Sequence, residues 1–125
     1  MTKMNMVWIA VATLIHPDTR PDRRVSKEQI DARVRKLFDA TITPVMITHH
    51  LVASEDRQKD RRDPRRGGSR NRYLTKHDNR YRLYRLSDKP NDGLDKTGPR
   101  CPSIGDVPEE FRHLVQWYRR DYVDP

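Results

Sequence analysis

Hydrophobic and polar positions divide the chain into short patterned segments, and each pattern predicts an element. Residues 6–15 are apolar on nearly every side of a helix and predict a buried helix, which Pro17 and Pro21 end. A strand is the alternative for this segment, because a short apolar run rich in β-branched residues fits either element. The first predicted element therefore has no polar face.

The second segment carries the start signals of a helix. Ser26 is followed three residues later by Gln29, which predicts a capping box, and Val25 and Ile30 are placed to form a hydrophobic staple around it. Apolar residues then recur with helical spacing at Ile30, Val34, Leu37 and Phe38. This pattern predicts an amphipathic helix of about three turns.

A link over residues 39–43 leads to a third predicted helix, which runs from Pro44 to about Ser54. Thr43 is its expected N-cap, and proline suits the first helical position, where its missing N–H has no partner to lose. The face of this helix that can meet the core carries Ile47, His50, Leu51 and Ser54. The opposite face carries Val45, Thr48, His49 and Val52.

Residues 72–86 predict a β-hairpin. Asp78 and Asn79 suit a two-residue type I′ turn, because both residue types tolerate positive φ. This turn pairs Leu74 with Leu83 on one face, which we expect to pack inward. The other face carries Tyr73, Thr75, Arg82 and Tyr84. This second face is expected either to stack on nucleic acid or to pack against a terminal helix.

The last predicted element is an amphipathic helix that begins at Pro108. Its apolar stripe consists of Phe111, Leu114, Val115, Tyr118 and Tyr122. We expect Trp117, Tyr118 and Tyr122 to form an interface with a second copy or another protein, since aromatic residues concentrate in interface cores. The alternative is that the stripe completes the core of the monomer.

Charge changes the interpretation of the polar stretches. The 125 residues include 26 lysines and arginines and 18 aspartates and glutamates, a net charge of +8. Residues 55–72 alone hold 8 basic and 4 acidic side chains, so their net positive charge is half of that of the whole chain. This segment has no aliphatic or aromatic side chain. A basic domain of this size most often binds a polyanion, and nucleic acid is the leading candidate.

The length predicts one compact domain over residues 1–86, which includes the basic segment 55–72. An irregular connector over 87–106 and a C-terminal helix over 107–125 follow. No apolar run reaches the ~18 residues that a membrane span needs. The single cysteine, Cys101, excludes an intrachain disulfide, so we expect a cytoplasmic protein.

The predicted order of elements resembles that of winged helix-turn-helix DNA-binding proteins, over roughly residues 5–86. The segments MVWIAVATLI, THHLVAS, RYLTK, YRLYRL and EEFRHLVQWYRRDY are similar to those of a group of small uncharacterised prokaryotic proteins of this fold. The resemblance implies an α+β fold, with a three-helix core, a β-hairpin wing and an added C-terminal helix. It also implies that the third helix enters the major groove while the basic wing contacts the backbone.

The resemblance implies a transcriptional regulator, or a repressor of the toxin–antitoxin type, that binds double-stranded DNA. The residues expected at the DNA are Thr43, Val45, Thr48, His49, Val52, Arg57, Lys59, Arg61, Arg62, Arg65, Arg66, Arg70, Arg72 and Arg82. Between Thr43 and Ser54, however, the predicted recognition helix has no Arg, Lys, Asn or Gln, the residue types that most often bind base edges. Backbone binding is therefore expected more than base-specific recognition.

Two other classes of function remain open. A protein–protein adaptor would use the aromatic C-terminal helix, and an RNA-binding module would use the tyrosine face of the hairpin. No nuclease-like set of carboxylates and no phosphate-binding glycine motif occurs, so we expect no enzyme. We expect no metal or cofactor, because His49 and His50 point about 100° apart on a helix and no C-x-x-C or H-x₃-H spacing occurs.

Overall fold

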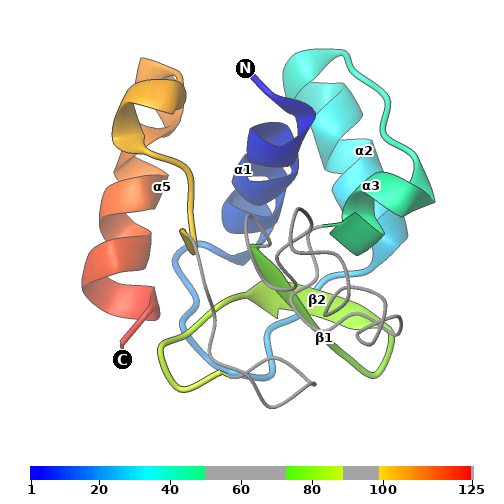
Figure 1. Cartoon of the computed structure of the whole chain (residues 1–125). Helices are drawn as coiled ribbons and strands as arrows, with labels where there is room; N and C mark the ends of the chain where they lie inside the picture. The colour runs from blue at the N-terminus through cyan, green and yellow to red at the C-terminus, as the bar shows by residue number, and fades with distance from the viewer. Residues whose placement is uncertain (50–72, 89–98, 125) are drawn as a thin grey trace, which may run out of the picture.

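The computed structural model describes residues 1–49, 73–88 and 99–124 (Figure 1). Its helices are α1 (Lys3–Ile15), α2 (Lys27–Phe38), α3 (Pro44–His49) and α5 (Arg112–Trp117). Its strands β1 (Leu74–His77) and β2 (Arg80–Leu83) form an antiparallel hairpin. Two 3₁₀ turns (Ile104–Asp106 and Glu109–Phe111) precede α5, and a π-helical turn (Tyr118–Tyr122) continues it. The predicted α+β class is confirmed for this part of the chain.

The helix α1 lies at the centre of the described structure, between α2 on one side and α5 on the other (Figure 1). Residues 7–12 have no exposed surface. The segment lacks a polar face because neighbouring elements cover it on every side. This confirms the predicted buried helix over the alternative strand. In the described residues no helix is long and apolar enough to cross a membrane.

The predicted capping box begins α2. The Ser26 hydroxyl accepts a hydrogen bond from the Gln29 backbone N–H at 3.2 Å, and the Gln29 side chain accepts one from the Ser26 N–H at 2.9 Å. Asp39 ends the helix in the left-handed conformation, with a φ of 50°. Ile30 and Val34 are fully buried and α2 packs against α1, which confirms the predicted amphipathic helix.

The hairpin has the predicted register. Leu74 pairs with Leu83, and Asp78 and Asn79 have φ values of 52° and 61°, as a type I′ turn requires. The chain before α2 also pairs with β2. The Val25 N–H donates to the carbonyl of Tyr81 at 2.8 Å, and the Val25 carbonyl accepts the N–H of Tyr81 at 2.7 Å. This bridge attaches the hairpin to the helices.

Both faces of the hairpin are buried. On the face that carries tyrosines, Tyr73, Thr75, Arg82 and Tyr84 are at most 7% exposed. The C-terminal chain covers part of this face, since the Tyr118 hydroxyl donates a hydrogen bond to the Tyr84 carbonyl at 2.6 Å. This face was expected either to stack on nucleic acid or to pack against a terminal helix, and in the structure it packs within the fold.

The aromatic residues of the C-terminal helix complete the core. Trp117, Tyr118 and Tyr122 are 4%, 1% and 0% exposed. The ring of Tyr118 meets that of Trp8 edge to face, with centroids 5.6 Å apart. The structure therefore has the alternative, in which the apolar stripe completes the core of the monomer, and a contact of these residues with a second copy or another protein stays a prediction. A chain with only 34% hydrophobic residues needs these large rings to close its interior.

Candidate nucleic-acid interface

The residues predicted to bind DNA fall into three groups. Thr43 immediately precedes α3, and Val45, Thr48 and His49 belong to that helix. Arg82 lies in β2. The predicted continuation of the third helix to Ser54 lies outside the described residues. The remaining residues predicted at the DNA lie outside them as well: Val52, Arg57, Lys59, Arg61, Arg62, Arg65, Arg66, Arg70 and Arg72. In the described residues, the predicted interface is thus formed by α3 and the hairpin.

Thr43 caps α3, as predicted. Its hydroxyl oxygen accepts a hydrogen bond from the Met46 N–H at 3.4 Å, and its carbonyl oxygen lies 3.0 Å from the same nitrogen. Thr43 and Pro44 are exposed, so the start of the helix is open to solvent. The cap engages the hydroxyl oxygen, which leaves the hydroxyl proton for a base or phosphate.

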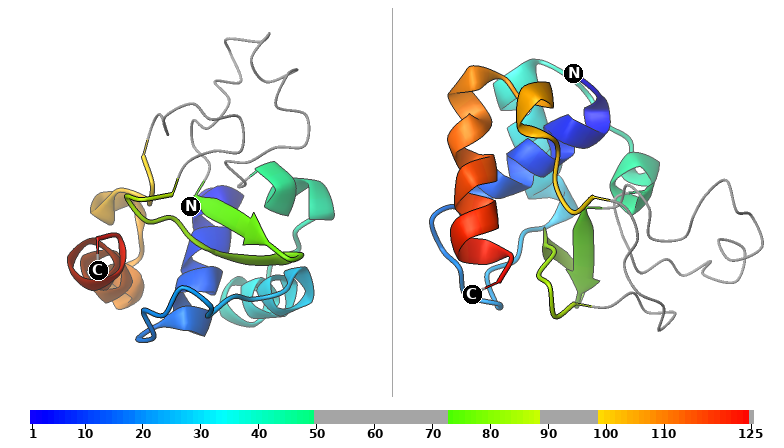
Figure 2. Two further views of the ribbon diagram at one scale, coloured as in Figure 1. Left: turned by 90° about the horizontal axis from the view of Figure 1, so that it is seen from below. Right: turned by 60° about the vertical axis from the view of Figure 1, so that its left-hand side comes forward.

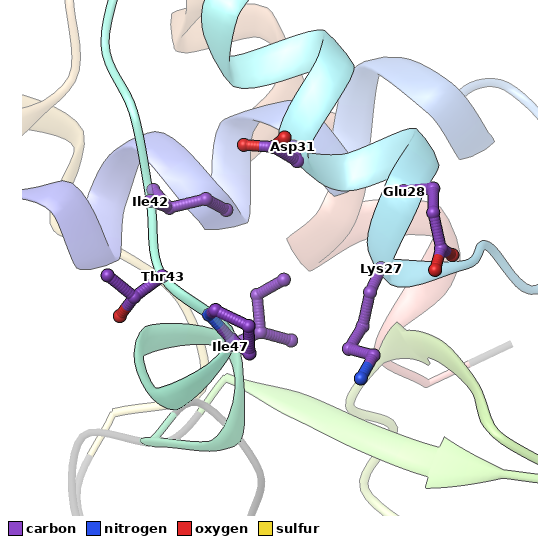
Figure 3. Close-up of a pocket in the computed structure, with 7 residues that line it drawn as sticks. Lys27, Glu28, Asp31, Ile42, Thr43 and Ile47 are labelled. Atoms are coloured by element: carbon purple, nitrogen blue, oxygen red, sulfur yellow. The ribbon is translucent and has the colours of Figure 1, made fainter.

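A pocket of about 200 Å³ lies between the N-terminal ends of α2 and α3 (Figure 3). Ile42 and Ile47 line its apolar part, and Lys27, Glu28 and Asp31 line it from α2. In Figure 3 the Lys27 side chain extends from α2 toward the hairpin. Because two carboxylates accompany one ammonium group, this pocket offers a phosphate no net attraction.

Arg82 is buried in an ion pair. Its guanidinium donates two hydrogen bonds to the Asp88 carboxylate, at 2.8 and 2.9 Å, and one to the Leu83 carbonyl at 3.1 Å. The side chains are 8% and 15% exposed. Burial acts to lower the pKa of Arg82, but the Asp88 carboxylate outweighs it and the pKa is raised. This corrects the predicted role of Arg82 at DNA, because its charge is already neutralised inside the fold.

Arg85 is a second structural arginine and is 4% exposed. Its guanidinium lies 4.1 Å from the centre of the Tyr122 ring and donates hydrogen bonds to the carbonyls of Tyr122 and Thr19. Its backbone N–H donates to the Asp88 carboxylate at 2.8 Å. These contacts tie the end of the hairpin to the C-terminal helix and to the link between α1 and α2.

The accessible cations of the hairpin lie at its tip. Lys76 is partly buried and Arg80 is exposed, and they lie on either side of the turn. Arg24, in the chain that pairs with β2, lies 3.6 Å from the Asp78 carboxylate. We call Arg24, Lys76 and Arg80 the hairpin-tip surface. The alternation along β1 places Lys76 on the inward face of the hairpin, together with Leu74. Its position beside the turn, like that of Arg80, is the sequence signal that could have indicated partial exposure to solvent.

His77, next to this surface, gives a pH-dependent prediction. Burial lowers the pKa of His77, and the positive charge of Arg82, 3.4 Å from Nε2, lowers it further. The unfolded chain then takes up the proton at higher pH, so His77 destabilises the folded protein as the pH falls from about 6.5 toward the folded pKa. We expect the imidazole to titrate with a midpoint below 6.5 by NMR; a midpoint at or above 6.5 would contradict this.

No group of three His, Cys, Asp or Glu side chains in the described part of the chain is placed to hold a metal ion. Cys101 is buried, and burial raises the pKa of its thiol, which keeps it protonated. The chain matches no protein-family model, no curated protein and no solved structure.

Proposed function

We propose that this protein has a winged-helix fold and binds double-stranded DNA, mainly through the phosphate backbone. The described elements are compatible with that fold: α1, α2 and α3 form the helical part, and the hairpin would be the wing. The bridge between Val25 and Tyr81 attaches this wing to the helices, so that a ligand held by both would meet one rigid surface.

The observation that carries the proposal is the location of accessible positive charge. Arg82 and Arg85 are enclosed in the fold, whereas in the hairpin-tip surface Arg80 is exposed and Arg24 and Lys76 are partly exposed. The segment 55–72, with half of the excess charge, is joined in the chain to α3 at one end and to β1 at the other. A polyanion that lies along the hairpin would therefore also meet the most basic part of the chain, because that segment leads directly into β1.

The composition of α3 limits the kind of DNA recognition. Between Pro44 and His49 the helix has no Lys, Arg, Asn or Gln, so it offers few hydrogen bonds to base edges. Phosphate contacts then dominate the affinity, and the sequence preference is weak. A role as a transcriptional regulator or repressor fits such binding when the shape of the DNA selects the site.

The aromatic residues on which the two alternative functions depend are less accessible than the hairpin tip. A protein–protein adaptor would use the C-terminal helix, where Trp117 and Tyr122 are buried, and an RNA-binding module would use Tyr73 and Tyr84, which are buried as well. The hairpin-tip surface, by contrast, is accessible and carries more cations than carboxylates. DNA binding is thus the function that the accessible groups support best.

The proposal predicts that the affinity for DNA depends on salt concentration and that the cations of the hairpin tip contribute to this dependence. We expect duplex DNA to bind at low salt, with log K falling linearly with log salt concentration. In the double variant Lys76→Ala/Arg80→Ala the slope should fall in magnitude by about two, because each lost phosphate contact removes roughly one counterion. Fluorescence anisotropy with labelled duplexes of two unrelated sequences measures both slope and sequence preference.

A matched control removes two exposed cations elsewhere. Lys36 is in the last turn of α2, and Arg120 is in the π-helical turn at the C-terminus. Lys36 lies about 14 Å along the helix from Lys27, at the end away from the hairpin. Lys36→Ala/Arg120→Ala should therefore leave the slope unchanged. Absence of binding at low salt overturns the proposal, and equal slopes for the two double variants overturn the role of the hairpin tip.

Deletion of residues 57–70 tests the basic segment separately. We expect this variant to lose most of the salt dependence, because the deleted residues include seven of the eight cations of residues 55–72. Circular dichroism should show that the helices are retained. A deletion variant with unchanged affinity and slope would restrict the interface to the hairpin tip and α3.

A further inference from the structure

Two adjoining pockets lie at the N-terminal end of α1 and are lined in part by residues of the chain that precedes α5. Figure 2 (right) shows this chain, from residue 99 on, passing the start of α1 on its way to α5. Their volumes are about 300 and 490 Å³, and both are lined by Thr2, Asn5 and Asp106. The smaller pocket continues to Tyr73, and the larger one to Arg112. The three shared residues therefore occupy the middle of one continuous concave site.

Asn5 is the most informative residue of this site. It is only 8% exposed, yet its side-chain amide has no hydrogen bond to any described residue. Its backbone N–H, by contrast, is bonded to the Thr2 hydroxyl at 3.2 Å. The amide nitrogen and oxygen are not among the side-chain atoms of the described residues that are cut off from solvent without a partner, so the small exposed part of Asn5 faces the pocket. An amide at the junction of two pockets can exchange water for a ligand there, with two N–H donors and one carbonyl acceptor.

The N-terminus of α1 adds backbone donors beside Asn5. Thr2 caps the helix, and its carbonyl accepts the Met6 N–H at 3.1 Å. The N–H groups of Lys3 and Met4 precede the first helical hydrogen bond and have no acceptor among the described residues. The first turn of this 13-residue helix has no acidic residue to offset its partial positive charge. This end of the site therefore favours an anionic group.

Two opposite charges line the larger pocket without pairing with each other. Among the described residues, neither the Asp106 carboxylate nor the Arg112 guanidinium forms an ion pair. Arg112 uses only its Nε, which donates to the Val107 carbonyl at 3.0 Å and leaves both terminal nitrogens of the guanidinium available. A separated carboxylate and guanidinium complement a ligand that carries both charges itself.

We infer that this site binds a free α-amino acid with an apolar side chain. The ligand carboxylate would lie between the N-terminus of α1 and Arg112, and its ammonium group would bind Asp106. The Asn5 amide would bond to both, donating to the carboxylate and accepting from the ammonium. The side chain would enter the smaller pocket, where Tyr73 and Pro102 provide contact surface. This inference is independent of the proposed DNA binding.

The test is thermal unfolding of the whole chain with L-leucine, L-methionine or L-phenylalanine at 10 mM. A ligand that binds the folded state alone raises Tm, and we expect a rise of about 3–8 °C for at least one of the three. The N-acetyl amide of the same amino acid keeps the side chain but lacks both charges, and should give no rise. No rise with any of the three, or an equal rise with the uncharged derivative, overturns the inference.

Substitutions of Asp106 and Arg112 test whether these two residues bind the ammonium and the carboxylate of the ligand. Asp106→Asn and Arg112→Gln change exposed residues, so both proteins should fold, and each should weaken binding at least tenfold. Glu110→Gln and Arg120→Gln are the matched controls, since these exposed residues lie outside both pockets. They should bind as the unchanged protein does. If binding survives in both Asp106→Asn and Arg112→Gln, the amino acid binds elsewhere and the inference fails.

Discussion

Replacing Asp88 with alanine is expected to lower the free energy of unfolding by about 3–5 kcal/mol. The change leaves the charge of Arg82, whose side chain is 8% exposed, without a counterion inside the fold. It also deprives the Arg85 N–H of its acceptor. The loss is a large part of the roughly 5–15 kcal/mol that stabilises a typical domain. Urea unfolding followed by circular dichroism measures it, with a lower midpoint and an unchanged slope expected.

Two further variants separate the buried charge from a general effect of losing an aspartate. Asp121→Ala removes an ion pair with Arg120 whose side chains are 75% and 42% exposed, and it should leave stability nearly unchanged because solvent screens this pair. The double variant Arg82→Met/Asp88→Ala should recover part of the loss, because no unpaired charge remains inside. An Asp88→Ala protein as stable as Asp121→Ala would mean that the pair does not hold the hairpin in place.

Replacing Trp8 with alanine is the second change with a large expected effect, a loss of about 3–5 kcal/mol. Trp8 has no exposed surface and lies in α1, against which α2, β2 and α5 all pack. Its ring contacts Tyr118 edge to face at 5.6 Å, so the cavity would open between α1 and the C-terminal helix. Chemical unfolding measures the loss, and Ile104→Ala, at a residue that is 37% exposed, is the control with little expected effect.

Phenylalanine at position 8 tests the reason for that loss. The indole N–H of Trp8 is buried and has no hydrogen-bond partner, so its removal relieves a cost. Trp8→Phe keeps one aromatic ring against Tyr118 and should therefore lose clearly less stability than Trp8→Ala. Equal losses for the two substitutions would show that the volume of the whole indole, and not burial of an aromatic ring, is what the core requires.

The elements that the sequence predicted correctly depend on interactions between residues a few positions apart. The capping box of Ser26 and Gln29 requires two hydrogen bonds across one turn, and both are present. The turn at Asp78 and Asn79 requires two residues that tolerate positive φ, and this choice determined the register of the hairpin. Such local chemistry can be read from the sequence because no distant part of the chain changes it.

The candidate site was harder to predict, because exposure depends on distant segments. Arg82 alternates with apolar residues along β2 as a solvent-facing residue would, but Asp88 and the C-terminal helix enclose it. Tyr84 likewise lies on the face that the alternation leaves open, and the hydroxyl of Tyr118, 34 residues later, donates to its carbonyl. Because these arginines and tyrosines lie inside the fold, the accessible positive charge of the hairpin is at its tip, where Arg80 is exposed and Arg24 and Lys76 are partly exposed.

By itself the sequence determined α1, α2 and the start of α3, the hairpin register and the uneven distribution of charge, including the basic segment 55–72, whereas the predicted helix from Pro108 begins as a 3₁₀ turn and becomes α-helical only at Arg112. Tertiary structure alone decided which charges and aromatic rings face solvent. The physical reason is the shortage of apolar residues, at 34% of the chain. A core built from so few apolar residues must bury both faces of the hairpin and the aromatic rings of the C-terminal helix. Arg82 and Arg85 are enclosed together with these residues.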